Sequence, residues 1–346
     1  MSEYSDLTDE LDQGFADVII PEKVKGRVLH IDGDILAYQC AGNDDTPLAI
    51  ARGNLVSRID NMRIFSGSER AVVHITDARS DKGRRYEIAK TWPYQEQRTH
   101  SKRPKNWAGL RMVLEEMCVS DPMHFISHEF AEADDGLNIA AWEGQAHDPN
   151  LVVIASMDKD LRQSPGWYLH WDTNELIYRQ HSNMGKLLYT DPDLAAACVE
   201  SAKTLKHGTL FGGIWFLLYQ MLYGDSTDNI PGLQKAIGPT LFEVVPDFFS
   251  KKVQDGKEAP PDKPVGPALA AKILAKFPQS KPSQAYAYIK KLYQANYGEK
   301  EGITVFTEQW QLLGLFINNS GARLALATQI RDGKFDYEVE NAEAPE

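Results

Sequence analysis

"RVLHIDGD", residues 27–34, holds a short and almost continuously apolar run that ends at an aspartate, Asp32, just before a glycine. Runs of the same kind recur downstream, and segments long enough for helices separate them. They are "AVVHITD" at 71–77, "MHFISHEF" at 123–130 and "LVVIAS" at 151–156. Strands that are buried in a parallel sheet have this composition, and helical crossovers connect them. The sequence therefore predicts an α/β protein with a central, mostly parallel sheet.

Acidic residues follow every one of these four runs. In chain order they are Asp32 after the first run, Asp77 after the second, Glu132, Asp134 and Asp135 after the third, and Asp158 and Asp160 after the fourth. Open α/β sheets bind ligands beyond the carboxyl ends of their strands, so we expect these acids to gather along one edge. Carboxylates gathered there would repel one another unless cations lay among them.

A further acidic pair, Asp225 and Asp228, lies in "MLYGDSTDNIPGL" at 221–233, between an apolar segment and an Ile-Pro-Gly turn. Taken singly, each acidic motif also fits a surface turn or a helix cap. Their combination favours one shared site. Oxygen ligands are those that Mg²⁺ and Mn²⁺ prefer, and two such ions about 4 Å apart promote phosphodiester hydrolysis. A metal-dependent nuclease is therefore the natural hypothesis.

The chain has 346 residues, of which 42% are hydrophobic, enough for one large or two modest folded domains. Its longest apolar stretch, Ile214 to Leu222, is shorter than the roughly 20 residues that a membrane-spanning helix needs. The N-terminus is acidic where a signal peptide would be basic. We therefore expect a cytoplasmic protein with no membrane partner. Cys40, Cys118 and Cys198 form no metal-ligand spacing, and no disulfide is expected.

The net charge of −12 argues at first against a nucleic-acid partner, because phosphate binding needs Lys and Arg at the contact surface. The acids, however, are concentrated in tails at 1–20 and 331–346, and residues 81–107 form a basic band with interleaved aromatic residues. Its cations include Arg84, Arg85, Lys90, Arg98, Lys102, Arg103 and Lys105, and its aromatic residues are Tyr86, Trp92, Tyr94 and Trp107. Such a band fits a solvent-exposed segment or a guide for a phosphate backbone.

Five motifs carry a resemblance to a known family. They are "VLHIDGD", "ITDARSDKGRRYE", "EFAEADDG", "ASMDKDL" and "GDSTDNIPGL", in this order. Together they resemble the 5′ nuclease family, which comprises flap endonucleases, bacteriophage 5′ to 3′ exonucleases and the 5′ nuclease domain of bacterial DNA polymerase I. The resemblance covers about residues 26–280 and is strongest to the free-standing phage exonucleases. It implies a PIN-like core at 21–224 with a basic arch at about 80–110. A helical DNA-binding region at 225–330 would follow, with an inserted loop at about 247–264.

The resemblance also implies roles for the acidic and basic residues. One Mg²⁺ would be held by Asp32, Asp77, Glu132, Asp134 and Asp158, and a second by Asp135, Asp160, Asp225 and Asp228; Mn²⁺ could substitute. Arg85 would meet the scissile phosphate. The family commonly has Tyr-Lys followed three positions later by Arg, and this chain keeps Tyr94 and Arg98 but has Gln95 at the lysine position. Lys90, one helical turn earlier, is the expected source of the missing charge.

Family members grip duplex DNA with a helix-hairpin-helix, whose glycine-rich turns commonly bind K⁺. Gly232 is the expected first turn of this element. For the second turn the sequence offers Gly238 in "IGPTLFEVV" and Gly266 in "VGPALAAKILAKF", of which Gly266 is favoured. Lys272, in the helix predicted after Gly266, would then contact DNA.

The function implied by the resemblance is hydrolysis of DNA at 5′ ends, flaps or nicks, by exonuclease or flap endonuclease action, which leaves 5′ phosphates. RNA–DNA hybrids are a further expected substrate, and the acidic N-terminal tail could contact a replication protein. Two alternatives stay open. A haloacid-dehalogenase-type phosphatase also has an aspartate after its first strand and a late motif similar to "GDSTDN". The other is a DNA-binding scaffold of the same fold without catalysis.

Overall fold

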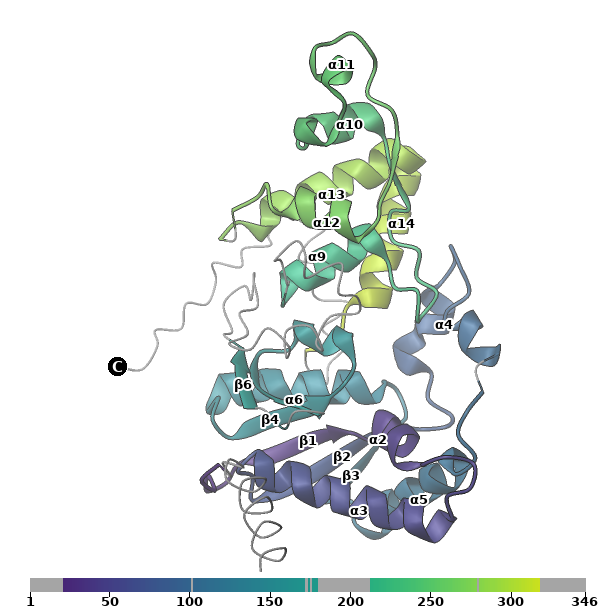
Figure 1. Ribbon diagram of the computed structural model, residues 1–346, viewed down its shortest axis with the longest axis vertical. Coiled ribbons are helices and arrows are strands. Elements are labelled where there is room, and N and C mark those ends of the chain that lie inside the picture. The colour runs from purple at the N-terminus through teal and green to yellow at the C-terminus, as the bar shows by residue number, and fades with distance from the viewer. Residues whose placement is uncertain are drawn as a thin grey trace, which may run out of the picture.

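The computed structural model describes residues 21–100, 102–171, 174, 176–179, 212–278 and 280–317. Both acidic tails and Cys198 lie outside these residues. The described chain forms two stacked parts: a sheet with its helices in the lower half of Figure 1, and a group of helices above it. Within the described residues no helix is both long and apolar enough to span a membrane.

A six-stranded sheet organises the lower part of the described chain, with the strand order β3-β2-β1-β4-β5-β6. Neighbouring strands pair in parallel, except that β6 runs antiparallel to β5. The strands are β1 (Val28–Asp32), β2 (Arg70–Thr76), β3 (Phe125–His128), β4 (Val152–Ser156), β5 (Gly166–His170) and β6 (Leu176–Arg179). The four strands that the apolar runs predict are present, which confirms the predicted α/β class.

Helices cover both faces of this sheet (Figure 1). One face packs against α2 (Gly33–Cys40), α3 (Leu48–Phe65) and α5 (Trp107–Ser120), and the other against α6 (Ala133–His147). The alternation of side chains along β1 explains the division, because Leu29 and Ile31 enter the core beneath α2 and α3. His30 and Asp32 alternate with them and therefore face the side that α6 covers.

The packing of α6 depends on a row of histidines across three strands. His30 Nδ1 lies 2.8 Å from His74 Nε2, and His74 Nδ1 lies 2.9 Å from His128 Nε2. A Cβ atom at Gly136 would lie only 2.3 Å from His128 Nε2 and 2.8 Å from His74 Nδ1. Glycine at this position therefore lets α6 approach the row closely, and this close approach fixes the helix N-terminus at the carboxyl ends of β1 and β2.

The upper part is built on α9 (Ile214–Tyr223), the apolar segment of the sequence, whose side chains are nearly all buried. Packed against α9 are α12 (Pro267–Leu274), α13 (Pro282–Tyr297) and α14 (Glu299–Leu313). In α12, Leu269 and Ile273 are buried and contribute to this core. The two parts meet where Arg85 Nε donates to the carbonyl of Leu312 in α14.

Between α9 and α12 the chain makes an excursion to the top of Figure 1, where α10 (Gly238–Phe242) and α11 (Lys251–Gln254) lie. Pro246 begins a short 3₁₀ helix, η4 (Pro246–Phe248), so the helix of "IGPTLFEVV" is as short as this proline predicts. The excursion is closed at its base by the strands β7 (Lys235–Ala236) and β8 (Lys263–Pro264). The expected loop at about 247–264 therefore contains helical turns and a paired strand.

The basic band forms short helical turns between the two parts. They are η1 (Lys82–Arg84), α4 (Arg85–Ile88) and η2 (Glu96–His100). Residues 89–95 are not helical. Lys90 and Gln95 therefore do not share a helix face, contrary to the reasoning that assigned Lys90 the missing charge. On the other side of the band, α4 packs against α14.

Candidate active site

Two groups of carboxylates lie where the sheet meets the upper helices. We call Asp32, Glu132, Asp134 and Asp135 the sheet-side group, because β1 and the N-terminus of α6 carry them. We call Asp160, Asp225 and Asp228 the helix-side group, because η3 (Lys159–Gln163) and the segment after α9 carry them. Asp158 connects the two groups electrostatically, since its charge raises the pKa of Asp32, Asp134, Asp160 and Asp228.

Asp32 ends β1 and caps α2, where its Oδ1 accepts hydrogen bonds from the backbone N–H groups of Asp34 and Ile35. Its Oδ2 accepts a hydrogen bond from Ser156 Oγ at 2.8 Å. Burial, followed by the charge of Asp34, raises the pKa of Asp32 to about 7. The local capping role considered from the sequence is therefore real, but the buried, acid-rich surroundings point to more than a cap.

The N-terminus of α6 carries three acids with different surroundings. Glu132 and Asp135 form a capping box, in which Asp135 Oδ2 accepts from the Glu132 N–H at 3.1 Å. The Asp135 carboxylate also accepts two hydrogen bonds from Arg85, at 2.8 Å and 3.0 Å. Burial, and then the charges of Asp135 and Glu132, raise the pKa of Asp134 well above its ordinary value. Asp135 is therefore fully engaged by protein groups, whereas no cation of the described residues forms an ion pair with Asp134.

The helix-side group has the geometry of a cation site. One oxygen of each carboxylate, Asp160, Asp225 and Asp228, lies within 4.8 Å of the others. Burial raises the pKa of Asp160 well above its ordinary value and that of Asp228 to about 6. Buried carboxylates with raised pKa values favour a bound cation, and an all-oxygen donor set suits a hard divalent ion. The residues present therefore fit Mg²⁺ or Mn²⁺.

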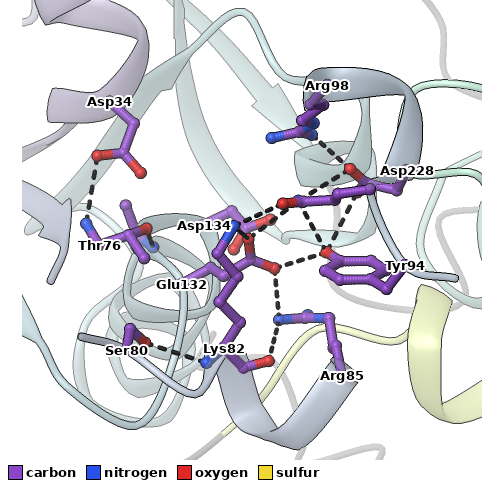
Figure 2. Close-up of polar contacts among 12 residues, drawn as sticks. Asp34, Thr76, Ser80, Lys82, Arg85, Tyr94, Arg98, Glu132, Asp134 and Asp228 are labelled. Atoms are coloured by element: carbon purple, nitrogen blue, oxygen red, sulfur yellow. Dashed lines mark hydrogen bonds and ion pairs between the residues drawn. The ribbon is translucent and has the colours of Figure 1, made fainter. Parts of the chain in front are cut away.

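Side chains from the basic band and from η3 neutralise part of this charge. Arg98 Nη2 lies 2.5 Å from Asp228 Oδ1, and Lys159 Nζ lies 3.0 Å from Asp225 Oδ1. Asp160 Oδ1 accepts a hydrogen bond from the amide of Gln220 at 2.6 Å. Figure 2 shows the same pattern around Tyr94, whose hydroxyl group lies between Glu132 and Asp228, at 2.7 Å and 3.3 Å. Tyr94 thus connects the two groups of carboxylates.

Asp77 and Arg85 both contact other protein groups, and metal binding by Asp77 stays a prediction. Asp77 lies at the flank, where Arg79 and Ser127 bind its carboxylate, and the backbone N–H of Arg79 is the main cause of its lowered pKa. Arg85 is only 2% exposed and donates to Glu132, to Asp135 and to the carbonyl of Leu312. A direct contact of Arg85 with phosphate stays a prediction, while the structure shows Arg85 as the internal counter-ion of the α6 acids.

The structure does not bring Lys90 to the carboxylates. Its backbone N–H donates to Glu308 Oε1 at 2.8 Å, and the residue lines a surface cavity beside Glu301 and Tyr297. The cation beside Gln95 is instead Lys82, whose Nζ lies 2.5 Å from Gln95 Oε1. Sequence reasoning missed both Lys82 and Lys159. Lys159 lies between two acids of the "DKD" motif, which was an available signal, whereas no spacing rule connects Lys82 with Gln95.

The candidate hairpin glycines lie near the closed base of the excursion. Gly232 has φ +62°, and a Cβ atom there would lie 2.4 Å from the backbone nitrogen of Gly224. The N–H of Gly238 is taken by Asp262, whereas Gly266 is the N-cap of α12. The Val265 N–H donates to the Gln234 carbonyl at 2.8 Å. This hydrogen bond brings the residue before Gly266 next to the segment that begins at Gly232. Lys272 of α12 lies 5.2 Å from the ring of Phe248.

No family model matches the chain, and no curated protein does. Similar solved structures include the flap endonuclease of bacteriophage T5 in a pseudo-enzyme-product complex with DNA and metal ions, with 14% identity and a TM-score of 0.44, covering 90% of this chain and 100% of that one. A second is the T5 5′-exonuclease with bound zinc, with 14% identity and a TM-score of 0.42, covering 89% and 99%. Because these likenesses are weak, a functional assignment depends on the geometry of the site itself.

Proposed function

We propose that this chain is a metal-dependent nuclease. The observation that carries the proposal is the convergence of carboxylates from separate segments, with raised pKa values for Asp32, Asp134, Asp160 and Asp228. Assembling so much negative charge costs stability unless the charge binds cations. A protein gains from such an arrangement when divalent ions complete it, and perturbed pKa values of this kind concentrate at functional sites.

Within that class, we propose a 5′ nuclease that acts on DNA at free 5′ ends, flaps or nicks. The five ordered motifs support this choice, and they extend it to RNA–DNA hybrids. Asp32, Glu132, Asp134 and Asp158 would hold one Mg²⁺ or Mn²⁺ ion, and Asp160, Asp225 and Asp228 a second. When bound, two such ions polarise water and stabilise the leaving oxygen in phosphodiester hydrolysis.

The chain's own residues would position the substrate for this reaction. The oxygen of a water molecule attacks the scissile phosphorus, and the bond from phosphorus to the 3′ oxygen breaks. One proton of the water ends on the 3′ hydroxyl group and the other is released, so the products are a 3′ hydroxyl and a 5′ phosphate. Arg98, with a side chain that is 44% exposed, lies where it can approach the phosphate backbone. Tyr94 and Gln95 hold the acids of the two groups in fixed positions by donating hydrogen bonds to Glu132 and Asp228.

The DNA duplex would be held by the upper helices. We propose that the segments containing Gly232 and Gly266 form a helix-hairpin-helix. The pairing of β7 with β8 supports this proposal, because it closes the base of the excursion that separates the two glycines in the sequence. Free N–H groups at such turns bind phosphate, and K⁺ could occupy the same element. The N–H of Gly238, which Asp262 already engages, is the weaker alternative.

The test uses a duplex with a 5′ single-stranded flap, labelled separately at each end, with and without Mg²⁺. We expect short products that carry the 5′ label, only when Mg²⁺ is present, and none from Asp158→Asn. Asp60→Asn is the matched control, because the Asp60 side chain is exposed on the surface of α3, where it pairs with Arg63. Intact DNA binding without any cleavage by the wild type would leave the scaffold alternative. Release of phosphate from a small phosphate ester instead would support the phosphatase.

A further inference from the structure

The side chain of Lys82 reaches the sheet-side group from the turn before α4 (Figure 2). Its Nζ donates to Gln95 Oε1 at 2.5 Å and lies 3.5 Å from Glu132 Oε1. The Gln95 amide donates in turn to Glu132 Oε1 at 3.3 Å and to Asp228 Oδ1 at 3.0 Å. The Lys82 ammonium therefore contacts Glu132 directly, and the amide group of Gln95 connects it with Asp228.

The backbone holds Lys82 in this place at an energetic cost. Lys82, Gly83 and Arg84 have successive left-handed conformations, with φ 51°, 63° and 60°, and Gln95 has φ 56°. Each such non-glycine residue is strained, because its Cβ atom crowds the following carbonyl oxygen. The conformation is maintained by Ser80 Oγ, which accepts from the Lys82 N–H at 3.1 Å, and by Asp81, which accepts from the Gly83 N–H. Strain that is maintained in this way concentrates at functional sites.

Lys82 differs from two of the other cations that contact the carboxylates, Arg85 and Lys159. Arg85 is buried and bonded to two acids, and Lys159 is paired with the buried Asp225. The Lys82 side chain is 21% exposed, and its shorter contact is to a neutral amide. An ammonium group has three N–H donors, and two of them are directed to Gln95 and Glu132. The ammonium also lies 5.6 Å from the centre of the Tyr86 ring, and because it is partly exposed, its third donor can reach an anion from solvent.

We propose that Lys82 is a catalytic residue that binds the scissile phosphate and stabilises its developing negative charge. This inference rests on the proposed nuclease function. Lys82, and not Lys90, would then supply the positive charge that the sequence lacks at Gln95. Gln95 can occupy the expected lysine position because the Lys82 ammonium lies directly beside it. Lysine acts on phosphate as a compact point charge, so the position of the ammonium matters more than the segment that carries it.

The experiment compares wild type, Lys82→Met and the double variant Lys82→Met, Gln95→Lys. Methionine keeps the length of the side chain and removes its charge. At saturating Mg²⁺ we expect the single-turnover cleavage rate to fall about 100-fold in Lys82→Met, the usual effect of losing one transition-state donor. The double variant places an ammonium at the neighbouring position and should recover at least about tenfold. Lys23→Met, which removes an exposed lysine paired with Glu69, is the matched control.

A second measurement reads out the contact without catalysis. In Ca²⁺, DNA affinity is compared for a normal flap and for one with a neutral methylphosphonate at the scissile position. Wild type should bind the charged flap more tightly, and Lys82→Met should discriminate between the two flaps about tenfold less than wild type does. Equal discrimination by both proteins would overturn the assignment of Lys82.

Two further outcomes separate this inference from the proposed function. If wild type cleaves and Lys82→Met regains full activity in excess Mg²⁺, Lys82 only neutralises Glu132, and the inference is overturned while the nuclease function stands. If wild type does not cleave any 5′ substrate, the proposed function is overturned, and the role of Lys82 with it.

Discussion

In the sheet-side group, Asp135 is fully buried and both of its oxygens accept hydrogen bonds from Arg85, which is itself buried. In the helix-side group, Asp225 is paired with Lys159 and Asp228 with Arg98, both of which are partly exposed. The first arrangement is permanent, since neither partner can leave without burying an unpaired charge. The second can exchange, because long side chains near solvent can withdraw when an ion or a phosphate arrives.

This difference shows how one site can both fold and bind cations. Asp135 and Arg85 neutralise each other and anchor the N-terminus of α6, so Asp135 contributes more to structure than to ligand binding. Asp134, Asp160 and Asp228 keep raised pKa values and remain available to a cation. The permanent pair of Arg85 and Asp135 therefore stabilises the fold at the site, and the exchangeable pairs of Lys159 and Arg98 leave room for a cation.

The largest expected effect comes from breaking the permanent pair. Arg85→Ala should lower the free energy of unfolding by about 3–5 kcal/mol, because it leaves Asp135 and Glu132 without their buried counter-ion. Urea unfolding followed by circular dichroism measures this change. Arg79→Ala is the control, because Arg79 is highly exposed and its pairing with Glu129 contributes less than about 1 kcal/mol. A loss as small as that of the control would show that the pair is not permanent.

The second prediction concerns pH in the presence of a chelator. The folded-state pKa of Asp32 is about 7, above its ordinary value, so the folded chain holds a proton that the unfolded chain releases at lower pH. Its contribution to stability is present below about pH 4 and is lost as the pH rises through 7. The difference corresponds to at most about 4 kcal/mol.

Unfolding measured from pH 4 to pH 8 should reveal this loss in wild type and a weaker one in Asp32→Asn. The pKa of Asp228 is raised to about 6, so its own loss of stability ends near pH 6. Asp228→Asn should abolish this loss and leave the loss caused by Asp32 unchanged. The pair of variants thus separates the contributions of the two groups. The buried histidines act in the opposite sense in all three proteins, so the difference between wild type and each variant is the informative quantity. Identical pH profiles for wild type and both variants would contradict the raised pKa values.

The smallest expected effect concerns the exchangeable pair. Lys159→Met removes an ammonium 3.0 Å from Asp225 Oδ1 that an incoming divalent ion must displace or share. We expect the affinity for Mg²⁺ to rise by about three- to tenfold, which is at most about 1.4 kcal/mol. Isothermal titration calorimetry gives this affinity directly. A lower affinity in the variant would mean that Lys159 organises Asp225 instead of competing for it.

The sequence predicts the sheet and the position of most acids because both follow from local patterns. The apolar runs of β1, β2, β3 and β4 have strand lengths, and acids follow each of them. β5 and β6 were not predicted. Helix α6 follows from the "GLNIAAWEG" segment, whereas its close approach to the histidine row depends on Gly136 and on contacts between strands. Contacts of this second kind have no signature in sequence spacing.

By itself, the sequence of this protein determined the α/β class and the acids at the strand ends, because apolar periodicity and the direction of parallel strands act locally. Only the tertiary structure decided which cation meets which acid. Arg85 is buried against Asp135, and Lys82 reaches Gln95 across a left-handed turn. Charges act through space, so their partners depend on how the backbone turns and how the helices pack. The order of the residues along the chain does not contain this information in a readable form.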